Sequence, residues 1–498
     1  MKNFSVACGV ALVAGVSLIE LPSGGGGPTV LQAQALSSVE APSSLEGVVR
    51  QYVRARYGAD LEAMQRSRPA YSFWQHIFQI PDGRIIFGSA GDGRLLATFP
   101  TRGNWTDDGV WEDAALERTL SGVRLPSNLA RRRDRVAERL EGVVGPIVHN
   151  PTRGRFLAPH ADRYGGFLGE WATIYERFGV PAEIGLAQAV VESGLNGRAR
   201  SPAQALGLCQ WLRRNWNHLN RLDPNVIEVF NQTTQAGYCA AHLTILATMY
   251  GSFIPALSEH HAGGVNVGRT VINGRRLGGI DTREQYLRGA EFARDLREIS
   301  IRRYRLLFRT YGPRSFLYSE MVFGNAVNVQ RLTVEMPQEQ VFAMRAPRAL
   351  SLAEVRQKTG LSTDEVKRYN PALVRRVPAG ANLYLPSYVE EFGPDVSFWH
   401  RTADPEFAGV LSEFVQLQPG VERWHARSFR ATLLDFQRRF EETATEEGTV
   451  MVTTLGYIIG NLFTSRRGAI LEEFRTSARI VRLFQQGVEE LRKVAVGS

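Results

Sequence analysis

The chain begins with an apolar segment whose pattern differs from the rest of the sequence. Lys2 precedes an apolar run from Phe4 to Ile19, and a glycine-rich stretch then leads to Ala-Gln-Ala at 33–35. A charged start, a short apolar core and a small-residue cleavage site are the parts of a secretory signal. The run is shorter than the roughly 18 to 20 residues that cross a bilayer, which disfavours a retained anchor. We therefore expect residues 1–35 to be an export signal and the mature protein to act in the periplasm or cell envelope.

Residues 36–150 combine a helical pattern at 45–64 with β-rich runs. The runs are separated by Pro-Asp-Gly at 81–83 and Gly-Asp-Gly at 91–93, which are turn sequences. The pattern predicts a small antiparallel β-meander with strands at 73–80, 84–88 and 94–99.

Apolar residues at three- and four-residue spacings then predict helices from Tyr164 to about Tyr311. We take residues 151–315 as one helical domain and 316–338 as a linker. Residues 339–388 predict a compact β-α-α-β unit, with strands at 340–344 and 382–385. Its two helices each open with a capping box, Ser351 with Glu354 and Ser362 with Glu365.

Residues 389–498 are predicted to be mainly helical, because their apolar positions follow helical spacing. Residues 448–465 carry no charge and reach spanning length, but threonines, glycines and Asn461 disfavour a membrane span. The expected fold class is therefore α+β, predominantly α, with an N-terminal meander, a helical domain, a β-α-α-β module and a C-terminal helical region.

Composition narrows the range of partners. The 498 residues carry a formal net charge of +9, which favours an anionic partner such as nucleic acid, a membrane surface or an acidic polymer. The positive charge comes mainly from scattered arginines without a basic block, so a nucleic-acid-binding tail is not indicated. After signal removal two cysteines remain, Cys209 and Cys239, and either a disulfide between them or two buried free thiols fits the sequence.

The strongest chemical candidate is a glutamate at the end of a predicted helix. Pro181 suits the first turn of this helix and Gly194 the position just past its end, so Glu192 falls in the last turn. The negative end of the helix dipole and the neighbouring Val190 and Val191 both disfavour the ionised carboxylate. A carboxylic acid with a raised pKa is suited to general acid catalysis. The alternative is an exposed glutamate that merely caps the helix poorly.

The surrounding motifs point to a family. The segment VVESGLNGRARSPAQALGLCQW at 190–211 resembles the glutamate-serine and Gly-Leu-x-Gln motifs of the soluble lytic transglycosylase domain. EHHAGG at 259–264 is similar to the later Ala-Tyr-Asn-Ala-Gly motif of that family, and TREQYLRGAEF at 282–292 to the tyrosine-containing helix that closes the domain. The resemblance implies a lysozyme-like fold that cleaves bacterial peptidoglycan.

The resemblance also implies a mechanism. Glu192 matches the single catalytic acid/base, which protonates the glycosidic oxygen between N-acetylmuramic acid and N-acetylglucosamine. It then takes the proton of the muramoyl C6 hydroxyl as that oxygen closes on C1, which gives a 1,6-anhydro sugar without water. No cofactor is implied. The substrate-binding residues expected from the matched motifs are Ser193, Ser201, Gly207, Leu208, Gln210, Tyr238, His260, His261, Gly263 and Tyr286.

Several positions depart from the family pattern. The family's methionine is Cys209, and its Tyr-Asn pair is His260-His261, preceded by Glu259. A second carboxylate at Glu259 would allow hydrolysis instead of the lyase reaction. Zinc ligation by Cys239, His242, His260 and His261 is allowed by spacing, but the resemblance accounts for the histidine pair without a metal, and we expect none.

The β-α-α-β unit has a resemblance of its own. LSLAEVRQKTGLSTDEVKRYNPAL, followed by PAGANLYLP, resembles a LysM module, which binds chains containing N-acetylglucosamine. Paired with the upstream domain, it is similar to membrane-bound lytic murein transglycosylases of the D type. Asn370 and Pro371 are the candidate glycan-binding residues here, whereas Pro-Arg-Ala at 347–349 replaces the usual Gly-Asp-Thr and disfavours tight binding.

The leading hypothesis is thus an exported peptidoglycan lytic transglycosylase with a glycan-binding module. The alternatives are a non-catalytic wall-binding or scaffold protein and a muramidase that uses water. The expected partners are peptidoglycan strands and not nucleic acid, with the C-terminal helices as a possible contact for membrane or cell-wall proteins.

Overall fold

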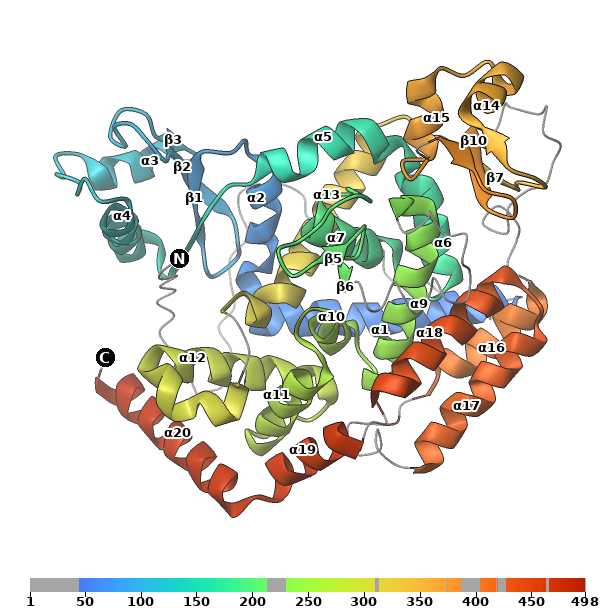
Figure 1. Ribbon diagram of the computed structural model, residues 1–498. Helices are drawn as coiled ribbons and strands as arrows, with labels where there is room; N and C mark the ends of the chain where they lie inside the picture. The colour runs from blue at the N-terminus through green and yellow to red at the C-terminus, as the bar shows by residue number, and fades with distance from the viewer. Residues whose placement is uncertain are drawn as a thin grey trace.

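The computed structural model describes residues 44–212, 230–309, 313–373, 375–386, 404–417, 419, 427–462 and 465–497. The predicted export signal at 1–35 lies outside the described residues. Figure 1 shows a mostly helical body with two smaller units above it, a sheet with short helices at one side and a β-α-α-β module at the other.

The helical body is built around α7 (Ala182–Ser193). This helix is apolar on nearly all sides, and such a helix is stable when it is buried on nearly all sides. Helices α6, α9 and α13 pack around it. The long α1 runs across the middle of the body (Figure 1). The other helices of the body have these bounds: α1 Leu45–Ser67, α5 Gly154–Tyr164, α6 Leu168–Arg177, α9 Gln232–Tyr250, α10 Phe253–Ala262, α11 Gly264–Arg276, α12 Thr282–Phe308 and α13 Tyr318–Glu335.

The N-terminal sheet has four antiparallel strands in the order β3-β2-β1-β4. Strands β1 (Arg84–Ser89) and β2 (Leu95–Pro100) coincide with two of the predicted runs. The sheet packs against α4 (Leu129–Val144) in a core of its own. The remaining elements are β3 Val110–Trp111, α3 Ala114–Glu117, η2 Arg118–Leu120 and β4 Ile147–Pro151.

The prediction of a strand at 73–80 was wrong. This segment is helical, in η1 (Pro69–Trp74) and α2 (Gln75–Gln79). Phe73, Ile77 and Phe78 are all buried, and their spacing of four and five residues places them on one face of a helix rather than on alternate faces of a strand. The aromatic and β-branched composition of the run had favoured the strand.

The prediction of a linker at 316–338 was also wrong, because η5 (Pro313–Leu317) and α13 fill most of it. Helix α13 packs against α7 and η1, and a Cβ at Gly324 would lie 2.1 Å from the carbonyl oxygen of Tyr71. Its buried face includes Asn325 and Asn328, whose amides donate to the backbone carbonyls of Trp74 (3.4 Å) and Gln75 (3.1 Å). Because these buried residues are polar, the buried face of the helix does not show up as a run of apolar positions in the sequence.

The module at 341–386 has the β-α-α-β order that the sequence predicts. Strands β7 (Val341–Arg345) and β10 (Asn382–Pro386) pair antiparallel, with α14 (Leu352–Thr359) and α15 (Thr363–Tyr369) between them in the chain. Of the two predicted capping boxes, the one at Ser362 forms in full. At α14 the carboxylate of Glu354 pairs with Arg348 instead of the N-cap backbone, so the predicted box at Ser351 is incomplete. A two-stranded pair, β8 Leu350–Ser351 and β9 Arg376–Val377, completes the module.

The C-terminal helices wrap around the right side and the bottom of the body in Figure 1, with α20 along α12. Their buried apolar side chains belong to the same core as those of α7, α9 and α10. No single helix in the described ranges is long and apolar enough to span a membrane; α9 and α10 pass such a test only as a pair bent by 119°. The bounds are α16 Pro405–Val415, α17 Arg427–Glu442, α18 Glu446–Leu462, α19 Ser465–Thr476 and α20 Ala478–Gly497.

Candidate active site

The end of α7 places Glu192 at the site. Gly194 adopts a left-handed conformation (φ 59°) and its N–H donates to the carbonyl of Val190 at 3.0 Å, which ends the helix at Ser193. A Cβ at position 194 would lie 2.0 Å from the carbonyl oxygen of Phe156, so the turn requires glycine for space as well as for conformation.

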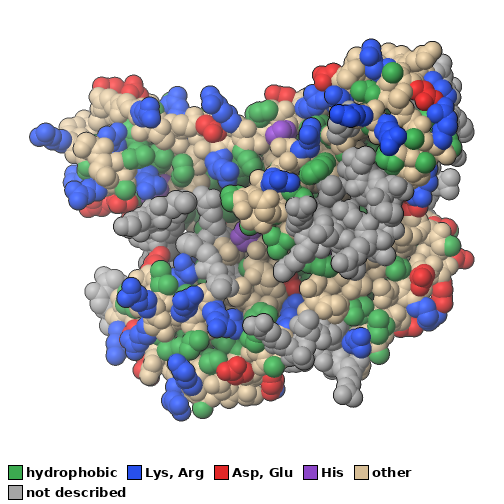
Figure 2. Space-filling model, in the orientation of Figure 1, with side chains coloured by type: hydrophobic (Ala, Val, Ile, Leu, Met, Phe, Trp, Pro, Cys, Tyr) green, Lys and Arg blue, Asp and Glu red, His purple; other side chains and the backbone are tan. Residues whose placement is uncertain are grey.

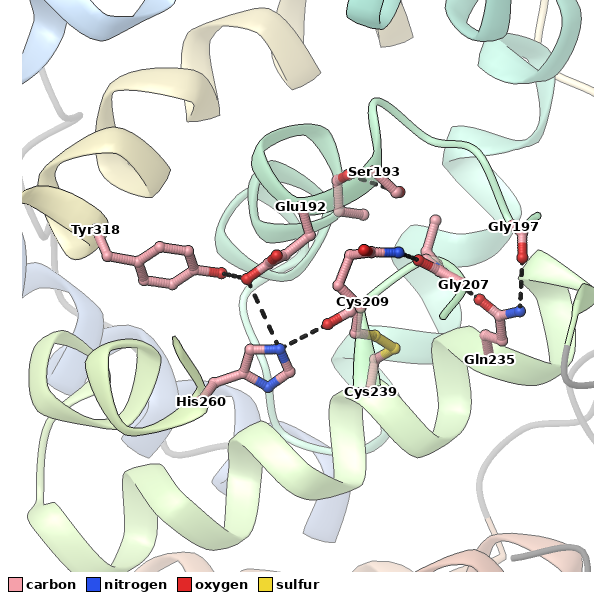
Figure 3. Close-up of a disulfide and its surroundings, with 12 residues drawn as sticks. Glu192, Ser193, Gly197, Gly207, Cys209, Gln235, Cys239, His260 and Tyr318 are labelled. Carbon is pink, nitrogen blue, oxygen red and sulfur yellow. Dashed lines mark hydrogen bonds and ion pairs between the residues drawn. A yellow bond between two sulfur atoms is a disulfide. The ribbon is translucent and has the colours of Figure 1, made fainter. Parts of the chain in front are cut away.

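The carboxyl group of Glu192 is nearly enclosed, with 13% of the side chain exposed. Tyr318, at the start of α13, donates its hydroxyl to Oε1 at 2.5 Å (Figure 3). Burial raises the pKa of Glu192 to about 7, although the hydrogen bond from Tyr318 favours the anion and opposes that shift. The carboxyl is therefore divided between its acid and anionic forms near neutral pH, which a group that first gives and then takes a proton requires.

His260, in the last turn of α10, faces Glu192 from the opposite side to Tyr318 (Figure 3). Its Nε2 lies 2.6 Å from the carbonyl oxygen of Cys209 and 3.8 Å from Oε1 of Glu192. A carbonyl only accepts, so Nε2 carries the proton of the neutral ring. Burial and the neighbouring His242 lower the pKa of His260 to about 3, so the ring beside Glu192 is uncharged at neutral pH.

Tyr318 contacts Glu192 but was not among the predicted site residues, because it lay in the predicted linker. His261 stacks on its ring, with centroids 4.6 Å apart and planes 9° from parallel. No motif links positions 192 and 318. The signal that could have found α13 is the helical spacing of Tyr318, Val322 and Phe323, all of which are buried.

The predicted substrate-binding residues Gly207, Leu208 and Gln210 lie in one stretch, 207–210, which we call the groove segment, and Gln235 of α9 holds it in place. Gly207 has φ 78°, and a Cβ there would lie 2.5 Å from Oε1 of Gln235. That oxygen accepts from the N–H of Leu208, while Nε2 donates to the carbonyl of Gly197 at 3.3 Å (Figure 3). Leu208 itself is fully buried. Gln235 was not among the predicted residues, since nothing in its local sequence marks it.

Gln210 is half-buried and its backbone has φ 53°. Its side-chain amide donates to the carbonyls of Ala199 (3.1 Å) and Gly207 (3.0 Å). The side chain thus closes the loop between the glutamate helix and the groove segment.

Cys209 and Cys239 form a disulfide with their Cα atoms 6.2 Å apart, which decides between the two states that the sequence left open. The bond joins the groove segment to α9 (Figure 3). Because the carbonyl of Cys209 also accepts from His260, the disulfide holds the hydrogen-bond partner of the ring that faces Glu192.

The remaining predicted substrate-binding residues lie in different environments. Ser193 is buried, and its hydroxyl donates to the carbonyl of Ala189 at 3.0 Å, so it does not face the site. Ser201 accepts from the N–H of Ala205 at 3.0 Å and closes a turn. Tyr286 is fully buried in the core on α12, Tyr238 is half-buried on α9, and Gly263 caps α10 at the surface.

The second carboxylate considered above is occupied by other partners. Glu259 accepts from Tyr250 and from Nη2 of Arg467 in α19, at 3.0 Å (Oε1) and 3.3 Å (Oε2). In the part of the chain that the structure describes, no group of three or more His, Cys, Asp and Glu side chains is arranged to hold a metal ion.

In the module, Asn370 is buried and joins α15 to β10. Its amide oxygen accepts from the N–H of Tyr384 at 2.8 Å, and its nitrogen donates to the carbonyl of the same residue at 2.6 Å. The predicted glycan-binding role does not fit this position, because the polar atoms of Asn370 are engaged inside the module. Pro371 beside it is half-buried.

Comparison with known protein families matches one part of the chain. Residues 170–279 match the family model of the transglycosylase SLT domain, and we call this segment the SLT domain. Members of this family are lytic transglycosylases that act on peptidoglycan. The SLT domain runs from α6 to the end of α11 and so contains Glu192, the groove segment, the disulfide and the histidine pair, but not Tyr318 or Arg467. A search of curated proteins finds no match to the chain.

Proposed function

We propose that the protein is an exported peptidoglycan lytic transglycosylase that cleaves the β-1,4 bond between N-acetylmuramic acid and N-acetylglucosamine. The observation that carries the proposal is the enclosed carboxyl of Glu192 in the SLT domain, which has a pKa near 7 and a tyrosine hydroxyl on one oxygen. A buried acid at that pKa is suited to protonate a glycosidic oxygen at neutral pH.

The reaction needs one residue to act twice. Glu192 gives its proton to the glycosidic oxygen as the bond from that oxygen to C1 of the muramoyl sugar breaks. The resulting carboxylate then accepts the proton of the C6 hydroxyl as the C6 oxygen bonds to C1. The proton and electron pairs balance within the substrate, and Glu192 ends in its starting state. Tyr318 stabilises the anion between the two steps through its hydrogen bond to Oε1.

The engagement of Glu259 favours this lyase reaction over hydrolysis. A hydrolytic mechanism of the usual kind needs a second carboxylate that can act as a base or nucleophile. Glu259 is paired with Arg467, and 10% of each side chain is exposed. Both oxygens of this carboxylate already accept hydrogen bonds from Arg467 and Tyr250, so Glu259 is poorly placed to activate a water molecule.

Export and substrate charge fit the same proposal. The Cys209–Cys239 disulfide suits an oxidising compartment, as does the predicted signal at 1–35. Figure 2 shows lysine and arginine side chains distributed over the visible face, including the outer side of the module. Such a surface suits a cell-wall polymer that carries carboxylates. We also propose that residues 339–388 are a LysM-like module.

Digestion of peptidoglycan sacculi by the purified mature protein tests the proposal. We expect muropeptides that are lighter by one water molecule than their reducing-end counterparts. Glu192→Gln should abolish their release. Glu183→Gln is the matched control, because Glu183 lies in the first turn of the same helix and pairs with Arg54. Reducing-end products would indicate a muramidase, and binding to sacculi without release would indicate a scaffold protein.

A further inference from the structure

The C-terminal region contributes a buried charge to the edge of the active site. Arg467 of α19 contacts both carboxylate oxygens of Glu259, and 10% of each side chain is exposed. Tyr250, the last residue of α9, donates to the same carboxylate. The neighbouring helices α9 and α10 and the distant helix α19 therefore meet at one charge in the last turn of α10.

The chain after Glu259 is shaped around the guanidinium of Arg467. A Cβ at Gly264 would lie 1.6 Å from Nη2 of Arg467 and 2.4 Å from Oε1 of Glu259. Any other residue at position 264 would displace the ion pair. The second glycine of the His-His-Ala-Gly-Gly segment is thus fitted to a side chain that lies outside the SLT domain.

The same turn of α10 carries the ring that faces the catalytic acid. Glu259 directly precedes His260, whose Nε2 donates to Cys209 and lies 3.8 Å from Glu192. The C-terminal region makes a second connection to His260, which begins at Tyr457 of α18.

Tyr457 stacks on Trp211, with ring centroids 6.4 Å apart and planes 19° from parallel. Trp211 packs against His242 at 5.1 Å, and His242 packs against His260 at 5.5 Å. The rings form a continuous row from α18 to the residue beside Glu192, so two contacts of different chemistry tie the C-terminal helices to the site.

We infer that Arg467 is a positioning residue for the transglycosylase reaction: it holds Glu259, and through the last turn of α10 it fixes His260 opposite Glu192. The inference rests on the proposed function, since it assigns a role in the reaction of that same site. It also makes α18 and α19 a functional part of the catalytic unit, beyond the boundary of the SLT domain.

The pair also sets the charge near Glu192. Tyr318 and the three neighbouring histidines, His242, His260 and His261, are neutral at pH 7. Burial raises the pKa of Tyr318 and lowers the pKa of each histidine. Loss of Arg467 leaves the anion of Glu259 uncompensated, which raises the pKa of Glu192. Loss of the Glu259 anion leaves a cation, which lowers it.

The test compares Arg467→Met, Glu259→Gln and the double variant in the full mature chain. Release of anhydro-muropeptides is measured against pH, and circular dichroism with thermal unfolding checks folding. Each single variant should lose at least about tenfold in rate, because one buried charge is left without its partner. The alkaline limb of the pH profile should move up by several tenths of a unit for Arg467→Met and down for Glu259→Gln, and return in the double variant.

Two further variants keep the result interpretable. Arg475→Met removes an exposed α19 arginine that pairs with Glu472 one turn earlier, away from Glu259, and it should leave rate and pH profile unchanged. If Arg467→Met does not fold, Arg467→Lys keeps the charge, and its pH limb should stay at the wild-type position with a smaller rate loss.

Wild-type rates in the folded single variants, or rate losses without opposite pH shifts, would overturn the positioning role. A wild-type protein that releases no muropeptides would instead overturn the proposed function itself.

Discussion

The β-α-α-β module and the C-terminal helices both follow the SLT domain in the chain, but they are stabilised in different ways. The module has a compact core of its own, in which Val355, Val366 and Leu383 are fully buried. The apolar side chains of the C-terminal helices, such as Leu433 and Leu455, are buried in the core of the helical body. The module thus has its own core and joins the body through one face that includes Tyr369 and Tyr384, whereas the C-terminal helices complete the body that holds the candidate site.

The largest expected difference concerns removal of each region. Deletion of residues 404–498 should abolish both soluble expression and activity, because it exposes the apolar core shared with α9 and α12. Replacement of residues 341–386 by a short Gly-Ser bridge should leave a folded, active protein, since Val341 and Pro386 are register partners and the chain ends lie close together. Solubility and muropeptide release measure both outcomes. An active protein without its C-terminal helices would contradict the comparison.

The two regions also differ in how far their contacts extend along the sequence, which explains what the sequence could predict. In the module, Ser362 and Glu365 cap a helix three residues apart, so a local pattern was enough. In the C-terminal region, Arg467 meets Glu259 and the carbonyl of Val415 accepts from Arg56, and no local pattern reveals either contact.

The candidate site shows the same division. Glu192, its helix and its glycine cap were predictable because proline, glutamate and glycine lie within one short segment. Tyr318 and Gln235 were not, because one lies on a helix with buried asparagines and the other bonds to backbone atoms distant in sequence. Ser193 and Asn370 were assigned to substrate from motif position, whereas packing turns both side chains towards their own backbone surroundings.

Truncation of one buried side chain in each region should reproduce this difference between the module and the C-terminal helices. Leu455→Ala in α18 should destabilise the whole body by about 2–5 kcal/mol, and Val355→Ala in α14 should destabilise mainly the module. Hydrogen exchange on the folded variants distinguishes the two, with faster exchange in α9 and α10 expected for the first and in α14 and α15 for the second. Equal changes in hydrogen exchange in both regions would show that the module and the body unfold together.

The disulfide offers a perturbation inside the SLT domain. The double substitution Cys209→Ala with Cys239→Ala should lower the free energy of unfolding by about 3–4 kcal/mol, because the bond closes a loop of 30 residues in the unfolded chain. Thermal unfolding of the wild type with and without dithiothreitol gives an independent measure. Dithiothreitol should not change the Tm of the Cys-free variant, and a change there would point to an effect unrelated to this bond.

The smallest expected effect is a shift in pH dependence. In the proposed reaction Glu192 begins protonated, and its pKa is about 7, so the rate should fall as the pH rises above that value. Tyr318→Phe removes a hydrogen bond that stabilises the anion, so the pKa of Glu192 should rise and the alkaline limb should move up by up to about one unit. Rates on soluble glycan fragments across pH 5 to 9 measure the limb. A downward shift would contradict the direction of this hydrogen bond.

The central claim is that Glu192 acts alone and that no water enters the product. Digestion of sacculi in water enriched in heavy oxygen, followed by mass analysis of the muropeptides, tests this claim most directly. The account predicts anhydro products without heavy oxygen at C1 of the muramoyl sugar. Products that have gained one heavy oxygen there would show that water is the nucleophile and that a base other than Glu192 must be sought.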